Sequence, residues 1–359
     1  MIKNILQLFN FKEKLHFLGL LFLILFTSML EMIGVGIIYP YINVIANNEL
    51  IEKNYYLKII YYNLGFSSTN SFIIFLSISL IFVLIIKNII LYFSQYIHQT
   101  FILMKRVKFI NLMLQGYLKS PYEYHINNNS VMLWRNLNQV DGVFTGILQP
   151  ILSLLAEATV VTFILLMMML TEFELTIISL ITILFPTIIM QRYYSSKLKK
   201  IGKESFELTG TSSKILFEAF GAIKDIFIIG IQAIFTNRYI KESIQLGLLR
   251  RDMVLIGMTP RPFLEPIIMS SLIIVILAIL IFQEKSIQDV LPIIALFATA
   301  AFRILNSINK IINNLQQLDF NQVINHEIVT EINRFKENPK VYSLDYLNNQ
   351  NLNFKSKSL

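Results

Sequence analysis

The chain has 359 residues, of which 55% are hydrophobic and only 15% are charged. About a quarter of the residues of a soluble protein are charged, so this composition excludes an ordinary soluble domain and indicates a protein of the lipid bilayer. The chain has no cysteine, which excludes disulfides and thiolate metal sites. The net charge of +8 could suit nucleic acid, but no basic run is interleaved with stacking aromatics. An excess of Lys and Arg on the cytoplasmic side of a membrane protein is the favoured interpretation.

Six apolar runs are long enough to cross about 30 Å of hydrocarbon as helices, which takes about 20 residues each. The first follows an amphipathic N-terminus without a small-residue cleavage site, so we expect it to be retained. The six predicted spans are 15–42, 71–97, 143–171, 173–191, 263–283 and 286–303.

The distribution of Lys and Arg predicts how these spans are oriented. Segments 97–142 and 192–253 hold five and eleven of the 31 basic residues, whereas the three other connections hold only Lys53, Lys58 and Lys285. Because basic residues stay on the cytoplasmic side, both termini and both long connections are predicted to be cytoplasmic.

The first outward connection, residues 52–65, has the sequence EKNYYLKIIYYNLG. Its spacing predicts a short helix with aromatic side chains, which prefer the membrane interface. Two interpretations stay open, a simple interfacial anchor or a helix that contacts a lipid ligand. The side chains concerned are Tyr55, Tyr56, Ile59, Ile60 and Tyr62.

The two long cytoplasmic connections keep apolar residues at a spacing of three to four over 98–120 and 192–250. This periodicity predicts amphipathic helices that continue the spans beyond the bilayer. Turn signals stand where these helices must reverse: Ser120–Pro121, then Asn127–Asn128–Asn129–Ser130, and Gly221.

The C-terminal part divides into two segments. Residues 304–338 read as a helix running into the cytoplasm, and residues after Pro339 are Asn-rich and polar, as linkers are. We therefore expect one transmembrane domain over 1–338 and a linker over 339–359.

Ionisable side chains at membrane depth are costly and commonly mark function. Lys87 lies within the second span, Arg261 begins the fifth and Arg303 ends the sixth. Glu31 and Glu157 are their acidic counterparts in the first and third spans.

Two interpretations of these charges remain open. In the first, Lys87 and Arg303 extend to the cytoplasmic interface, and Arg261 pairs with Glu265 one helical turn away. In the second, the three cations line a water-accessible cavity that attracts a phosphate or pyrophosphate headgroup, Arg by bidentate hydrogen bonds and Lys as a point charge.

The sequence contains no recognisable catalytic arrangement. The nearest approach to a phosphate-binding loop, Gly202–Lys203–Glu204, lacks the preceding glycine and the hydroxyl residue. The four histidines are far apart, which argues against a metal site, and no Ser/His/Asp set has a motif spacing. No cofactor is expected on this chain.

The arrangement of short outward hairpins, long cytoplasmic helical connections and a helical tail resembles the transmembrane domain of a type IV ABC exporter. Local sequence is similar to the lipid-linked oligosaccharide flippases of the PglK kind, over nearly the whole chain. The matching stretches are LEMIGVGIIYPYINVI (30–45), the aromatic helix at 52–65, GAIKDIFIIG (221–230), PRPFLEP (260–266) and AAFRILNSINKIINNLQQL (300–318).

The resemblance implies an all-α fold in the inner membrane and a homodimer whose helices exchange between halves. It also implies that Lys87, Arg261 and Arg303 are the cavity cations and that the aromatic helix contacts a polyprenyl lipid. The family usually has arginine at position 87, so lysine here would bind pyrophosphate as a point charge.

The resemblance further implies two coupling helices that dock on ABC nucleotide-binding domains, near Ser120–Ile126 and Leu216–Gly221. ATP and Mg²⁺ would bind that nucleotide-binding domain, which should begin near residue 345 with Asn351–Phe354 as its first strand. Because the sequence stops at Leu359, we expect this domain on a separate chain or in a missing C-terminal part. The implied coupling residues are Ser120, Pro121, Tyr122, Glu123, Leu216, Phe217 and Glu218.

The leading hypothesis is therefore the membrane part of an ATP-driven transporter that flips or exports a lipid-linked oligosaccharide. A peptide or lipid exporter of the same fold and a non-transporting scaffold or remnant remain alternatives. A membrane-embedded enzyme such as a glycosyltransferase is a third, although the sequence has no D-x-D pair.

Overall fold

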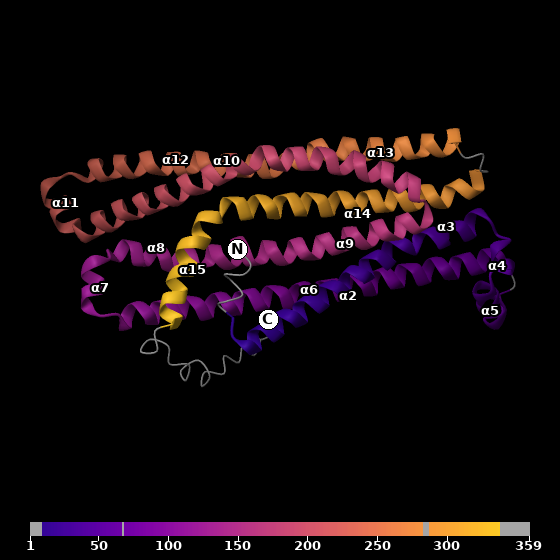
Figure 1. The fold of residues 1–359 in the computed structure, drawn as a ribbon, viewed down its shortest axis with the longest axis horizontal. Coiled ribbons are helices and arrows are strands. Elements are labelled where there is room, and N and C mark those ends of the chain that lie inside the picture. Colours follow the sequence, from indigo (N-terminus) through magenta and orange to yellow (C-terminus); the bar gives the residue numbers. More distant parts are fainter. Residues whose placement is uncertain (1–8, 67, 283–286, 338–359) are drawn as a thin grey trace.

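A computed structural model of the chain describes residues 9–66, 68–282 and 287–337. Long helices run side by side along the longest axis of the molecule (Figure 1). The connecting helices α7 and α11 lie at one end of this bundle, and α4 and α5 lie at the other. The linker predicted over 339–359, including the strand expected at Asn351–Phe354, falls outside the described residues.

Among the residues that the structure describes, six helical segments are long and apolar enough to cross a membrane. The predictions of an all-α, multi-pass membrane protein with six spans are confirmed at this level. The helices that form these segments are α2 (Phe11–Gly36) with α3 (Ile38–Ala46), α6 (Thr69–Lys119), α8 (Ser130–Val143) with the π-helix η1 (Phe144–Leu148) and α9 (Gln149–Thr171), α10 (Phe173–Gly221), α12 (Gln232–Met258) with α13 (Pro260–Phe282), and α14 (Ile287–Phe320).

The helices extend far past the length that a bilayer requires. Helices α6 and α10 have 51 and 49 residues. At 1.5 Å per residue each is about 75 Å long, more than twice the hydrocarbon thickness. The prediction that the amphipathic segments 98–120 and 192–250 are helical continuations of the spans is confirmed.

The chain reverses near the predicted turn signals. Helix α6 ends at Lys119, and α7 (Tyr122–Asn127) begins after Ser120 and Pro121. Gly221 ends α10, within the expected coupling segment Leu216–Gly221. Residues 216–221 form the last turns of α10, and the separate short helix is α11 (Ile223–Ile229). Gly230 terminates α11 with a φ of +78°, a left-handed conformation that glycine adopts without steric cost.

The short aromatic helix predicted within 52–65 is present as α5 (Tyr55–Asn63), and a separate helix, α4 (Leu50–Lys53), precedes it. Asn54 stands between the two helices. The Asn54 side chain accepts hydrogen bonds from the backbone N–H groups of Tyr56 and Leu57, at 3.0 and 3.4 Å. This N-cap satisfies donors that the first turn of α5 leaves unpaired, which explains the break.

The helical tail is also broken, where the sequence predicted one helix over 304–338. Helix α14 ends at Phe320, and α15 (Gln322–Glu337) turns away from it and crosses α8 and α6 (Figure 1). Asn321 stands at the bend, where its Nδ2 donates to the backbone oxygens of Gly146 and Gln317, at 3.3 and 2.8 Å.

The two largest buried apolar clusters of the described residues hold the bundle together. One joins α6, η1 and α15, with Phe109 stacked on Phe144 at 5.3 Å between ring centroids. The other joins α9, α13 and α14 through fully buried side chains such as Ile164, Ile268 and Ile312. Helix α14 is thereby fixed against α9 and α13, and its remaining face is left for polar residues.

Candidate functional site

Helix α14 has one apolar face and one polar face. Ala300, Ile304 and Ile308 are buried in the apolar cluster. Residues three or four positions apart lie on the same side of a helix, and this spacing places a row of basic and amide side chains on the other face. The row consists of Arg303, Asn306, Lys310 and Asn313, with Asn309 beside it.

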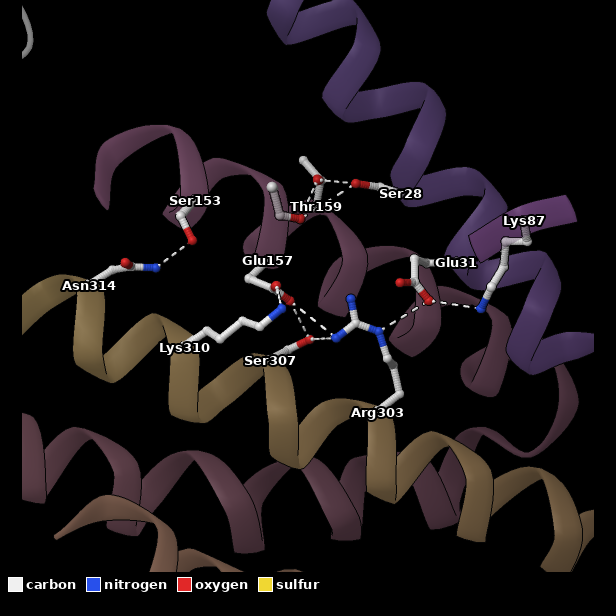
Figure 2. A network of polar contacts seen from close by, with 11 residues as sticks. Ser28, Glu31, Lys87, Ser153, Glu157, Thr159, Arg303, Ser307, Lys310 and Asn314 are labelled. Carbon is white, nitrogen blue, oxygen red and sulfur yellow. Dashed lines mark hydrogen bonds and ion pairs between the residues drawn. The ribbon is translucent and has the colours of Figure 1, made fainter. Parts of the chain in front are cut away.

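Glu157 of α9 is the buried centre of a network on this polar face (Figure 2). Its Oε1 lies 2.7 Å from Lys310 Nζ, and its Oε2 accepts a hydrogen bond from Ser307 Oγ at 2.8 Å. Arg303 Nη1 lies 3.3 Å from the same Oε2 and donates to Ser307 Oγ at 2.9 Å. The Glu157 side chain is only 8% exposed, so its charge depends on these partners for stabilisation.

Glu31 of α2 extends the network to a third and a fourth helix. Its Oε2 lies 3.2 Å from Lys87 Nζ on α6 and 3.2 Å from Arg303 Nε on α14. Gly34, one turn after Glu31, makes room for the lysine, because a Cβ there would lie 2.7 Å from Lys87 Nζ. The network therefore joins α2, α6, α9 and α14.

Uncharged pairs support the same contacts between helices (Figure 2). Asn314 Nδ2 donates to Ser153 Oγ at 2.7 Å between α14 and α9. Ser28 Oγ and Thr159 Oγ1 lie 2.7 Å apart between α2 and α9. These hydrogen bonds fix the helices that carry Glu31, Glu157 and Arg303, so the charged side chains meet in a defined register.

The polar face of α14 opens into a cavity of about 700 Å³. Arg261 of α13 also lines this cavity, and its Nε lies 3.9 Å from Glu265 in a pair that is largely exposed. The structure thus brings Arg261 and Arg303 to one cavity, and Lys87 joins the α14 wall through its contact with Glu31. The lining residues are Glu31, Gly257, Met258, Arg261, Pro262, Arg303, Asn306, Asn309, Lys310 and Asn313.

Several of these residues were not singled out from the sequence. Lys310, Ser307 and Asn313 follow Arg303 at helical spacing, and this pattern is the signal that could have identified them. No spacing could have paired Arg303 with Glu31 or Glu157, because these residues come from helices far apart in the chain.

The five predicted residues of the aromatic helix all lie exposed on α5, with Tyr55, Tyr56 and Tyr62 the most exposed. Tyr56 also lines an apolar groove of about 420 Å³ between α3, α5 and α6, together with side chains such as Val44 and Leu80. This end of the molecule therefore presents aromatic and aliphatic surface.

The first predicted coupling segment, Ser120 to Glu123, forms the turn into α7. Its neighbour Tyr124 donates a hydrogen bond to Glu331 Oε1 of α15 at 2.8 Å, and Arg334 lies over the Tyr124 ring at 4.9 Å. Burial, and then the Glu331 carboxylate, raise the pKa of Tyr124 above its ordinary value. Helix α15 thus packs against this turn.

The second predicted coupling segment lies in the last turns of α10. Leu216 is half-buried, the ring of Phe217 packs edge-on against Trp134 at 5.5 Å, and Glu218 lies 3.8 Å from Lys214. Beyond it, Phe220 and Phe227 are more than two-thirds exposed around α11.

Among the described residues, no group of three His, Asp or Glu side chains is placed to hold a metal ion. No model of a known protein family matches the chain. The chemistry that the cavity offers is the binding of an anion by guanidinium and ammonium groups, next to amides that can hydrogen-bond neutral polar groups.

Proposed function

We propose that the chain is the membrane-spanning part of an ATP-driven ABC transporter with the type IV exporter fold, and that it flips or exports a lipid-linked oligosaccharide or a related glycan. The observation that supports this function best is the single cavity that contains Arg261, Arg303 and Lys310 beside three asparagines.

The chemistry of the cavity walls suits a phosphorylated glycan. Guanidinium groups bind phosphate oxygens through paired hydrogen bonds, and an ammonium adds a mobile point charge. The amides of Asn306, Asn309 and Asn313 are both donors and acceptors, as sugar hydroxyls require. A volume of about 700 Å³ lies within the usual range for small-molecule sites.

The apolar end of the molecule suits the lipid part of such a substrate. The exposed rings of α5 and the groove beside α3 and α6 offer aromatic and aliphatic contacts. In this proposal the headgroup enters the cationic cavity while the polyprenyl chain stays in the membrane against α5.

The energy would come from ABC nucleotide-binding domains that bind ATP and Mg²⁺. They would dock at the turn into α7 and at the end of α10, in a homodimer of the inner membrane with cytoplasmic termini. Closure of these domains would rotate the helices and turn the cavity from one side of the membrane to the other.

A non-transporting membrane scaffold is the second candidate function. It is favoured by the pairing of Arg303 with both Glu31 and Glu157, since a cation so paired could serve only to hold helices together. Arg261 also lines the cavity, but it is exposed. If the cavity binds substrate, Arg261 must take part in transport, whereas a scaffold would not need it.

The replacement Arg261→Gln separates the two candidates. The side chain is 73% exposed, and its ion pair with Glu265 is long, at 3.9 Å, so its loss should leave the fold intact. Proteoliposomes that contain the chain with its ATPase would be tested for ATP-dependent translocation of a fluorescent polyprenyl-pyrophosphate-linked oligosaccharide. We expect the rate to fall about tenfold or more, as the loss of a hydrogen bond to a charged group predicts.

The matched control is Arg238→Gln, which removes an exposed arginine from α12 at a distance from the cavity, and it should translocate normally. Arg303→Gln should also abolish translocation while the dimer still assembles. Wild-type rates in both Arg261→Gln and Arg303→Gln would refute the role of the cavity, and no translocation by the wild type would favour the scaffold.

A further inference from the structure

The two carboxylates of the network differ in their relation to the cavity. Glu157 is buried between α9 and α14, and its two oxygens contact Lys310, Ser307 and Arg303. Glu31 lines the cavity itself. Of the two acids, Glu31 is therefore the one that an anion in the cavity would approach.

The contacts of Glu31 are also longer than those of Glu157 with Lys310 and Ser307, which measure 2.7 and 2.8 Å. Both of its ion pairs measure 3.2 Å, whereas charge-assisted N–H···O bonds are commonly about 2.7–2.9 Å long. Among the described residues, the buried Arg303 Nε makes no hydrogen bond, although Glu31 Oε2 lies 3.2 Å away. This donor could form a better aligned hydrogen bond with another oxygen.

The charges of the network do not balance. Lys87, Arg303 and Lys310 face the two carboxylates Glu31 and Glu157, so three positive charges meet two negative ones. If Glu31 released its two cations, Lys87 and the Nε side of Arg303 would be left to an incoming anion, while Glu157 would still contact Lys310, Ser307 and Arg303 Nη1. A group with several negative charges would compensate both cations together.

On the basis of the proposed function, we propose that Glu31 is a specificity-determining residue, an internal counter-anion that a pyrophosphate group must displace from Lys87 and Arg303. Glu31 occupies the two cations while the cavity is empty and repels anions that carry too little charge to replace it. A pyrophosphate offers several charged oxygens to the same two donors, so it can compete where a monovalent anion cannot.

Glutamine at position 31 keeps the length of the side chain and one acceptor oxygen but removes the charge. We expect Glu31→Gln to bind inorganic pyrophosphate about tenfold or more tightly than the wild type, because a nearby like charge is gone. We also expect the preference for pyrophosphate over chloride to narrow. Both are measured by titration calorimetry on the purified chain in lipid nanodiscs, which requires no ATPase.

Three variants serve as controls. Glu207→Gln makes the same change of charge on the exposed surface of α10 and should leave the affinity unchanged. Glu31→Asp keeps the charge but shortens the side chain, and its affinity for pyrophosphate should stay near that of the wild type. This variant separates the effect of charge from that of side-chain shape. Arg261→Gln should weaken binding, which places the bound anion in this cavity.

If Glu31→Gln is poorly folded, Lys87→Gln and the double variant Glu31→Gln/Lys87→Gln provide the same comparison without an unpaired lysine. Removing Glu31 should again raise the affinity in the Lys87→Gln background. Equal or weaker binding without Glu31, while the wild type binds and Arg261→Gln binds less, would overturn this inference and leave the proposed function standing. No binding by any variant would overturn both.

Discussion

The two walls of the cavity carry the same pair of residue types in different surroundings. On the α14 wall, Arg303 is 18% exposed and lies within 3.3 Å of Glu31 and of Glu157, from two other helices. On the α13 wall, Arg261 is 73% exposed and lies 3.9 Å from Glu265 of its own helix. An arginine paired with a glutamate can thus join distant helices or add little to the fold, and burial decides which.

The comparison assigns different roles to the two arginines. Removing one partner of a buried ion pair leaves an uncompensated charge, whereas an exposed pair between neighbouring turns contributes little. Arg303 therefore contributes both to stability and to the proposed binding, and Arg261 contributes to the proposed binding alone. Replacements on the α14 wall should lower stability more than a replacement of Arg261 on the α13 wall.

The largest effect is expected for Glu157→Ala. The change removes the acceptor of Ser307, Lys310 and Arg303 from a buried position, and it should lower stability by about 3 kcal/mol. The thermal unfolding temperature of the chain in detergent would measure this. Glu207→Ala, which removes an exposed carboxylate, is the control. Equal unfolding temperatures for the two variants would contradict the structural role of the α14 wall.

A smaller effect is expected for Ser307→Ala. Ser307 is fully buried, donates to Glu157 and accepts from Arg303, so its loss should lower stability by about 1 kcal/mol. The same thermal assay applies. Ser270→Ala is a matched control, because Ser270 is exposed and donates to the backbone oxygen of Pro266 in its own helix. If Ser270→Ala lowered the unfolding temperature as much as Ser307→Ala, the contribution of the Ser307 hydrogen bonds to stability would be contradicted.

The smallest effect on stability is expected for Arg261→Met. Its exposed pair with Glu265 should be worth less than about 0.5 kcal/mol, so the unfolding temperature should stay that of the wild type while binding of inorganic pyrophosphate weakens. If Arg261→Met lowered the unfolding temperature as much as Glu157→Ala, the proposed difference in stability between the two walls would be contradicted.

Much of the fold follows from local pattern. Apolar runs longer than a bilayer requires predict the spans, and helical periodicity predicts the continuations over 98–120 and 192–250. The break at Asn54 is also local, because its side chain caps the helix that follows it. The turn at Asn321 does not follow in this way, because its side chain bonds to the backbone oxygen of Gly146 in η1, which is distant in the sequence.

The site likewise has features that depend on local sequence and features that depend on the packing of distant helices. The sequence by itself determined that Lys87, Arg261 and Arg303 are costly charges in apolar helices, and that the residues after Arg303 repeat on one helical face, because both properties depend on neighbours within a few turns. Only the tertiary structure decided that Glu31 joins Lys87 to Arg303 and that Glu157 gathers the other side of the same guanidinium. These contacts depend on the packing of α2, α6, α9 and α14, and packing is set by the three-dimensional fit of buried surfaces rather than by spacing along the chain.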